Sequence, residues 1–185
     1  DSSTWARLPA GTSGQFLKTQ GTGANPTWGT VSAGFTLSSE QATTSGSSVT
    51  FGSIPAGTKM IIVNLAGVST NGTGGCGVQI GDAGGLETSG YAGRSTIAEG
   101  GGTVKNFSDH FEFGFLNAGD IQQGQFILTL QDASDYTWAC TFTVAVSGQN
   151  VWDGGGSKSL SAELTQVALR TDDTFDAGAA SIMYI

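Results

Sequence analysis

Alternating apolar and polar residues mark much of the chain from about residue 33 to its end. Phe111, Phe113 and Phe115 share one face of a short stretch. Residues 136–146 likewise place apolar side chains on one face and threonines on the other. A period of two residues is typical of a β-strand with one buried face. These stretches therefore predict strands of a packed sheet.

Further apolar runs and glycine-rich turns complete the predicted fold. Residues 60–65 are almost continuously apolar, which predicts a strand buried on both faces, and residues 180–185 end the chain on another apolar strand. Glycine supplies 30 of 185 residues without a collagen-like period, about twice its average share. No window of helical length has an apolar period of 3.6 residues with caps. We therefore expect an all-β fold, a jelly-roll-like β-sandwich over residues 33–185.

The first 32 residues differ from the rest because their apolar residues are sparse and separated by Gly, Ser and Thr. Residues 21–26 predict a turn between short strands at residues 16–19 and 27–31. A segment of this length cannot bury a core of its own. Residues 1–32 are therefore expected to form an extended stalk arm, which packs on its own domain or on neighbouring chains through Trp5, Leu8, Phe16, Leu17 and Trp28.

Charge and composition exclude several classes of partner. Charged residues make up 12% of the chain and the net charge is −8, so a nucleic acid or an anionic membrane surface is a poor partner. No apolar run approaches the roughly 20 residues of a membrane helix, so membrane insertion is not expected. The chain begins at Asp1 without a Met, which indicates a fragment or a processed product. Cys76 and Cys140 lack metal-site spacing and are expected to be free, buried thiols, with a disulfide as the alternative.

Catalytic chemistry finds little support, and no enzymatic activity, cofactor or metal site is predicted. His110 is the single histidine, and its position beside Glu112 favours a pair on the surface or at an interface. The glycines between residues 72 and 77 satisfy GxGxxG, but a strand follows them rather than a helix. Acidic pairs that could serve glycoside hydrolysis lie in turns, where Asp favours capping the local backbone: Asp82 with Glu87, Asp132 with Asp135, and Asp172 with Asp173.

Aromatic residues beside polar ones are the strongest candidates for binding. An aromatic ring can stack on the apolar face of a sugar while amide and carboxylate groups bond its hydroxyls. Trp138 is in phase with Cys140 and Phe142 and is predicted to lie in the core. The predicted binding residues, each with a structural role as the alternative, are Asn150, Trp152, Asp153, Asp135, Tyr136, Tyr91 and Phe107.

Several motifs resemble those of tail fibres from tailed bacteriophages. Residues 8–28, LPAGTSGQFLKTQGTGANPTW, look like the recurring LxxGTxGQxLxTxGxGxxPxW segment of these proteins. Residues 92–135 match no part of the pattern. The similar stretches of the main domain are SGSSVTFGSIPAG (45–57), GVSTNGT (67–73), GDAGGLETSGY (81–91), GGSKSLSAEL (155–164) and DTFDAGAASIMYI (173–185).

This resemblance implies the C-terminal, distal domain of a tail fibre. It implies a homotrimer with the arm at the trimer interface, joined to the rest of the fibre in a virion that is assembled in the host cytoplasm. It also implies binding to a bacterial surface glycan or outer-membrane component. Two alternatives stay open: a structural trimerisation or decoration module without receptor binding, and a glycan depolymerase, which usually needs a larger body than this chain has.

Overall fold

The structure is a computed structural model, and it describes residues 7–30, 34–97, 103–114, 117–148 and 151–185. The chain divides into two compact units, Asp1–Gly34 and Phe35–Ile185. This division lies close to the predicted boundary between residues 32 and 33. No helix occurs in the described residues, and the prediction of an all-β sandwich is confirmed.

The second unit contains two sheets in which all paired strands are antiparallel. The larger sheet has nine strands, and β4 (Gln41–Ala42) joins it by pairing with β16. The other eight follow the order β10 (Val104–Phe107), β9 (Ala92–Ile97), β14 (Val151–Ser159), β13 (Thr137–Val146), β12 (Gln122–Asp132), β6 (Met60–Thr70), β16 (Phe175–Tyr184) and β3 (Thr36–Leu37).

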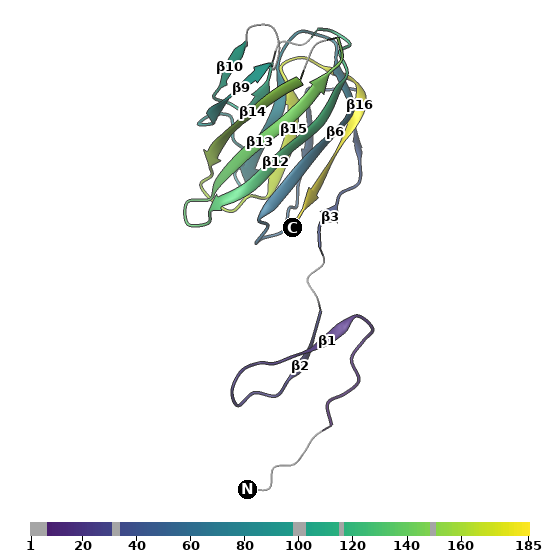
Figure 1. The fold of residues 1–185 in the computed structure, drawn as a ribbon, viewed down its shortest axis with the longest axis vertical. Coiled ribbons are helices and arrows are strands. Elements are labelled where there is room, and N and C mark those ends of the chain that lie inside the picture. The colour runs from purple at the N-terminus through teal and green to yellow at the C-terminus, as the bar shows by residue number, and fades with distance from the viewer. Residues whose placement is uncertain (1–6, 31–33, 98–102, 115–116, 149–150) are drawn as a thin grey trace. The chain divides into compact units, whose positions relative to one another are not determined.

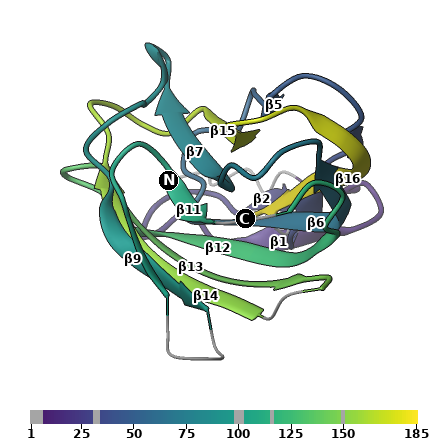
Figure 2. The same ribbon diagram turned by 90° about the horizontal axis from the view of Figure 1, so that it is seen from above.

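The smaller sheet has five strands and packs against the inner face of the larger one, which curves around it (Figure 2). Four of its strands follow the order β11 (Phe111–Phe113), β7 (Cys76–Asp82), β15 (Gln166–Thr171) and β5 (Ser48–Phe51), and β8 (Gly85–Leu86) pairs with β7.

Aromatic rings from both sheets meet in the core. The rings of Phe126 and Phe142 lie 4.6 Å apart, and the ring of Phe113, from the opposite sheet, lies 6.0 Å from that of Phe126. Trp138 and Cys140 are buried as predicted, and both cysteines are free. The alternation of residues 136–146 therefore identified a true core strand.

Strand β6 corrects one prediction. Its burial alternates, so that Ile61, Val63 and Leu65 face the core while Met60, Ile62 and Asn64 are partly exposed. The strand is not buried on both faces, because the outer face of the larger sheet is open along β6. A continuous apolar run does not reveal which alternate residues meet solvent.

The larger sheet is irregular where β6 meets β12. The register shifts between Gln122 and Gly124, and Gly124 pairs with Leu65. Gly124 has a φ of 152°, and a Cβ there would overlap the carbonyl oxygen of Thr143. A side chain is therefore excluded at this point, because it would collide with the backbone of β13.

The first unit contains a β-hairpin, whose strands β1 (Gln15–Lys18) and β2 (Thr27–Thr30) confirm the two short strands predicted there (Figure 1). The Trp28 indole N–H donates to the carbonyl oxygen of Pro9 at 2.7 Å, and its ring covers Gly11. Even so, Trp28 is 38% exposed and Leu17 is 53% exposed. The hairpin does not bury its own apolar residues.

Candidate functional site

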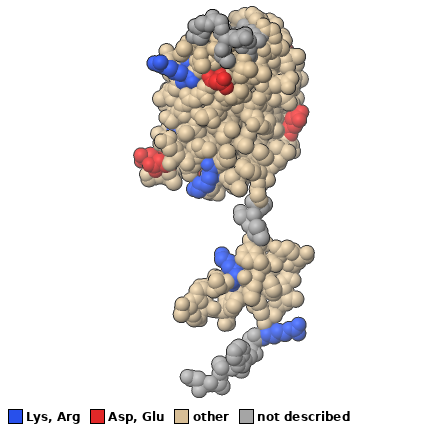
Figure 3. All heavy atoms as spheres, in the orientation of Figure 1, with Lys and Arg blue, Asp and Glu red and all other residues tan. Residues whose placement is uncertain are grey.

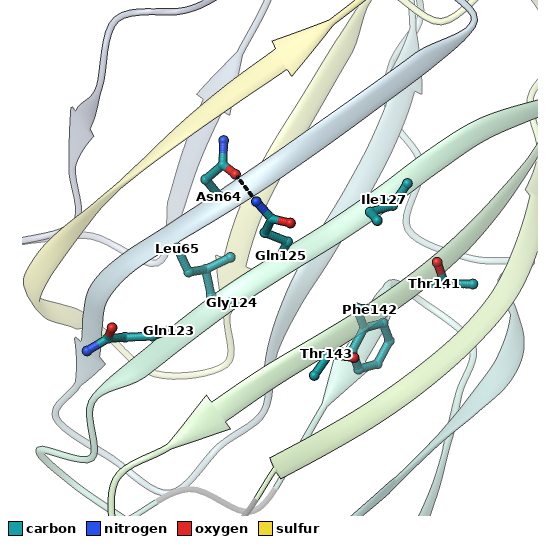
Figure 4. Close-up of a pocket in the computed structure, with 9 residues that line it drawn as sticks. All are labelled: Asn64, Leu65, Gln123, Gly124, Gln125, Ile127, Thr141, Phe142 and Thr143. Atoms are coloured by element: carbon teal, nitrogen blue, oxygen red, sulfur yellow. Dashed lines mark hydrogen bonds between the residues drawn. The ribbon is translucent and has the colours of Figure 1, made fainter.

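A groove of about 580 Å³ opens on the outer face of the larger sheet (Figure 4). It lies along the three neighbouring strands β6, β12 and β13, next to the irregularity at Gly124. Its volume falls within the range of about 300–1,000 Å³ that is usual for small-ligand sites. The residues that line it are Asn64, Leu65, Gln123, Gly124, Gln125, Ile127, Thr141, Phe142 and Thr143.

The groove is lined by neutral groups. Amides and hydroxyls come from outward positions of the strands, and none of the lining residues carries a charge. A carboxamide offers both donors and acceptors, and a hydroxyl can act as either. Ile127 adds an apolar side chain to this lining. The arrangement is therefore suited to a ligand with both hydroxyl groups and apolar patches.

Hydrogen bonds across the strands hold the polar side chains in place. The Gln125 amide donates to Asn64 Oδ1 at 2.8 Å, and the Asn64 amide donates to Ser181 Oγ at 3.4 Å. On the other side, the Thr143 hydroxyl donates to Asp153 Oδ1 at 2.6 Å. Gln125 and Thr143 are direct neighbours in the pairing of β12 with β13. These contacts leave further donors and acceptors on each amide.

A second depression of about 370 Å³ adjoins the groove and shares Gln123 with it. Ile121, Ala145, Val146 and Ser147 line the remainder. The two hollows run along the same pair of strands, so an elongated ligand could lie along both.

Few charged side chains lie on the face of the sandwich that carries β6, β12 and β13 (Figure 3). The groove has no lysine or arginine to neutralise an anionic ligand. Its surroundings therefore favour a neutral ligand.

The structure corrects the predicted binding role of Trp152. The residue is not in a loop but in β14, paired with Val144, and it is 1% exposed. A ring sealed in the core cannot stack on a receptor. The run of glycines after it belongs to the same strand.

Tyr91 and Phe107 are also core residues rather than surface ones. The rings of both pack edge-on against Phe111. The Tyr91 hydroxyl accepts from the Ile80 N–H at 2.9 Å and lies 3.1 Å from the Glu87 carbonyl oxygen. Burial raises the pKa of Tyr91 well above its ordinary value. The prediction of surface binding is wrong for both rings, because they fill the core.

The other predicted binding residues have separate locations. Asp135 is exposed beside the half-buried Tyr136, which has a φ of 49° in the turn between β12 and β13 and lines a small cavity of about 60 Å³. Asp153 is exposed and contacts the groove through Thr143. Asn150, like Trp5 of the arm, lies outside the described residues. Asp153 is thus the predicted residue that the structure places beside the groove.

Two of the acidic residues in the predicted pairs, Asp82 and Asp132, cap the local backbone as expected. Asp82 accepts from the Gly84 N–H at 2.8 Å and from the Ser161 hydroxyl at 2.6 Å. Asp132 accepts from the N–H of Ser134 at 2.8 Å. These hydrogen bonds lower the pKa of both carboxyl groups, with the hydroxyl of the neighbouring serine as the main cause.

The predicted surface pair of His110 and Glu112 is buried instead. Both faces of β11 are covered, because the chain packs over this short strand on the side that the pattern predicted to be exposed. A stretch of only a few alternating residues does not show whether its polar face meets solvent.

A signal for the groove is present in the sequence. Gln123, Gln125 and Ile127 alternate with core residues along β12, and Thr141 and Thr143 do so along β13. Their pairing across two strands could not be read from the pattern, since it depends on register. The predicted binding residues therefore do not include these amides and hydroxyls.

Comparisons with known proteins identify no family for the chain. No protein-family model matches it, and searches of the curated proteins and of the solved structures found no match either. Across the described residues, no helix has the length and apolar character that a membrane span requires. The assignment to tail fibres therefore stays a prediction that depends on the sequence motifs.

Proposed function

We propose that this chain is the distal domain of a bacteriophage tail fibre and that it attaches the virion to a bacterial surface glycan. The tail-fibre motifs of the sequence support the first part. The groove of β6, β12 and β13 supports the second, and it replaces Trp152, Tyr91 and Phe107 as the binding site.

The neutral, hydrogen-bonding lining of the groove is the observation that carries this proposal. Gln123, Gln125 and Asn64 offer amide donors and acceptors, and Thr141 and Thr143 add hydroxyls. A saccharide presents hydroxyls on its edges and C–H groups on its faces, which match these groups and Ile127 respectively. Because no cation lines the groove, we infer a neutral saccharide rather than a charged one.

Replacing Gln125 by alanine tests the groove directly. The variant loses an amide that faces the groove and bonds Asn64. Loss of one ligand hydrogen bond of about 1.4 kcal/mol weakens binding by about tenfold. Binding is measured by labelling a panel of bacterial strains with the fluorescent full chain, and then by titrating polysaccharide extracted from a labelled strain.

Gln131→Ala is the matched control, because Gln131 is an exposed residue of the same type on the same strand but does not line the groove. It should bind like the parent chain. Equal binding by all three proteins would exclude the groove as the receptor site, and failure of the parent to label any strain would count against receptor binding altogether.

The exposed apolar residues of the hairpin favour a second function, homotrimeric assembly of the fibre. Leu8, Phe16, Leu17 and Trp28 are all exposed in the single chain. Leu17 and Trp28 are partners in the hairpin, and exposed apolar side chains that lie together mark surfaces that other chains cover. Three arms packed around a shared axis would cover them, as the resemblance implies.

The mass of the chain in solution tests this assembly. Light scattering is expected to give three times the chain mass of 18.7 kDa, and a double variant, Leu17→Ser with Trp28→Ser, is expected to release monomers. A monomeric parent chain would contradict the trimer. A trimer that labels no bacterium would favour a purely structural module.

A further inference from the structure

A buried histidine lies between two carboxylates at the start of β11. Asp109, His110 and Glu112 each offer one ligand atom, and these three atoms lie within 4.8 Å of one another. Nδ1 of the imidazole is 3.1 Å from Oδ1 of Asp109, and Nε2 is 4.0 Å from Oε2 of Glu112. Three potential ligands from a short segment therefore converge on one point.

The imidazole of His110 lacks hydrogen bonds although it is sealed from solvent. The residue is 1% exposed, and neither ring nitrogen has a partner in hydrogen-bonding geometry. A buried polar group left in this way destabilises the folded chain. A neutral imidazole in this position can bind a metal ion through one of its nitrogens.

Two glycines leave room for these side chains. Strand β11 pairs with β7, where Glu112 is the neighbour of Gly77. A Cβ on Gly77 would lie 2.7 Å from Cδ2 of His110, and a Cβ on Gly75 would overlap the Glu112 carboxylate. The backbone next to the cluster thus carries no side chains where the imidazole and the carboxylate lie.

Each carboxylate turns one oxygen toward a cation and the other toward the ring. Lys105 contacts Oε1 of Glu112, which leaves Oε2 toward His110. Arg170 lies 3.4 Å from Oδ2 of Asp109, whose Oδ1 faces the ring. The oxygens that face His110 are therefore available to a metal ion.

We propose that Asp109, His110 and Glu112 bind one divalent metal ion of the first transition row, and Zn²⁺ is the ion we expect. One imidazole and two carboxylates are ligands that zinc takes in proteins, whereas Ca²⁺ and Mg²⁺ take oxygen ligands. Donors about 2.1 Å from a tetrahedral ion lie about 3.4 Å apart. The three ligand atoms lie within 4.8 Å of one another, so the widest of their separations closes by up to about 1.4 Å. Asp109, with its side chain 42% exposed, offers the entry path. The site does not depend on glycan binding.

A titration of the untagged full chain with ZnCl₂ tests the site. Because the chain has a single histidine, its ¹⁵N-labelled imidazole gives one unambiguous pair of nitrogen resonances. These resonances are expected to shift with one equivalent of Zn²⁺ and to stay in place with CaCl₂ or MgCl₂. The melting temperature should rise with Zn²⁺ alone, since an ion that binds only the folded chain stabilises it.

Two conservative variants separate ligation from charge. Asp109→Asn and Asp172→Asn each remove a carboxylate that pairs with Arg170, but only Asp109 belongs to the cluster. Loss of an outer-shell partner alone weakens metal binding by about tenfold or more, so Asp109→Asn, which removes a direct ligand, is expected to weaken zinc binding by at least about tenfold, and Asp172→Asn by much less. Lys105→Met, which frees the second oxygen of Glu112, should tighten it.

Several outcomes would overturn the proposal. Imidazole resonances that stay unmoved at a hundredfold excess of Zn²⁺ would do so, as would equal weakening by Asp109→Asn and Asp172→Asn. Zinc taken up without any change at the imidazole would show binding to exposed carboxylates instead and would equally exclude the site.

Discussion

Trp152 lies in the core beside a run of glycines that allows its strand to pack closely. A Cβ on Gly154 would collide with the ring of Phe142, and a Cβ on Gly156 would overlap the carbonyl oxygen of Ala92 on the next strand. These glycines serve close packing between β13, β14 and β9 rather than a turn. The residues next to Trp152 thus explain why the indole is buried.

Trp152→Ala is expected to destabilise the sandwich by about 3–5 kcal/mol, because it leaves a large cavity in the core. Urea unfolding followed by circular dichroism measures this loss. Val151→Ala is the control: its side chain is exposed on the same strand, and a surface change usually stays within about 0.5 kcal/mol. Equal stability of the parent and Trp152→Ala would contradict the core position.

At the scale of elements, a buried carboxylate joins two distant segments. Asp82 ends β7, caps the turn into β8 through Gly84, and accepts from Ser161 far along the chain. The Gln166 side-chain amide donates to the backbone carbonyl oxygen of Asp82 at 2.8 Å. The turn, β15 and the segment before β15 are therefore fixed together.

This carboxylate should make stability depend on pH in the acid range. Its pKa is lowered below the ordinary value of 3.8, mainly by the Ser161 hydroxyl, so the folded state favours the ionised form. The resulting stabilisation is present above pH 3.8 and is lost as the pH falls through the lower, folded-state pKa. Urea unfolding between pH 2 and pH 7 measures it. Asp82→Ala should remove this part of the pH dependence and Ser161→Ala should reduce it, while an unchanged profile in Asp82→Ala would contradict the role of the carboxylate.

The elements differ in how far the sequence predicts them. Long alternating strands such as residues 136–146 could be predicted, because one face is buried and the other is polar along their full length. The short strand β11 could also be predicted, but the burial of its polar face could not, since burial of His110 and Glu112 depends on which segments cover them. The groove escaped prediction because it needs the register of three strands and the irregularity at Gly124.

At the scale of the whole molecule, two units with different surface character share one chain. The hairpin unit exposes apolar side chains that its own residues do not cover, whereas the sandwich buries a large aromatic core. A fibre needs both properties, since one part must assemble with sister chains and the other must remain a stable folded head. We propose that the hairpin serves assembly and that the outer face of the larger sheet serves recognition.

The side-chain amide resonances of Asn64, Gln123 and Gln125 give the most direct test of recognition. Polysaccharide from a labelled bacterial strain is titrated into the ¹⁵N-labelled chain, and chemical shifts are followed residue by residue. The proposed function predicts that these amides and the backbone of Thr141 and Thr143 shift together, while Gln131 stays in place. Shifts confined to residues outside the groove, for example around Asp135 and Tyr136, would contradict it.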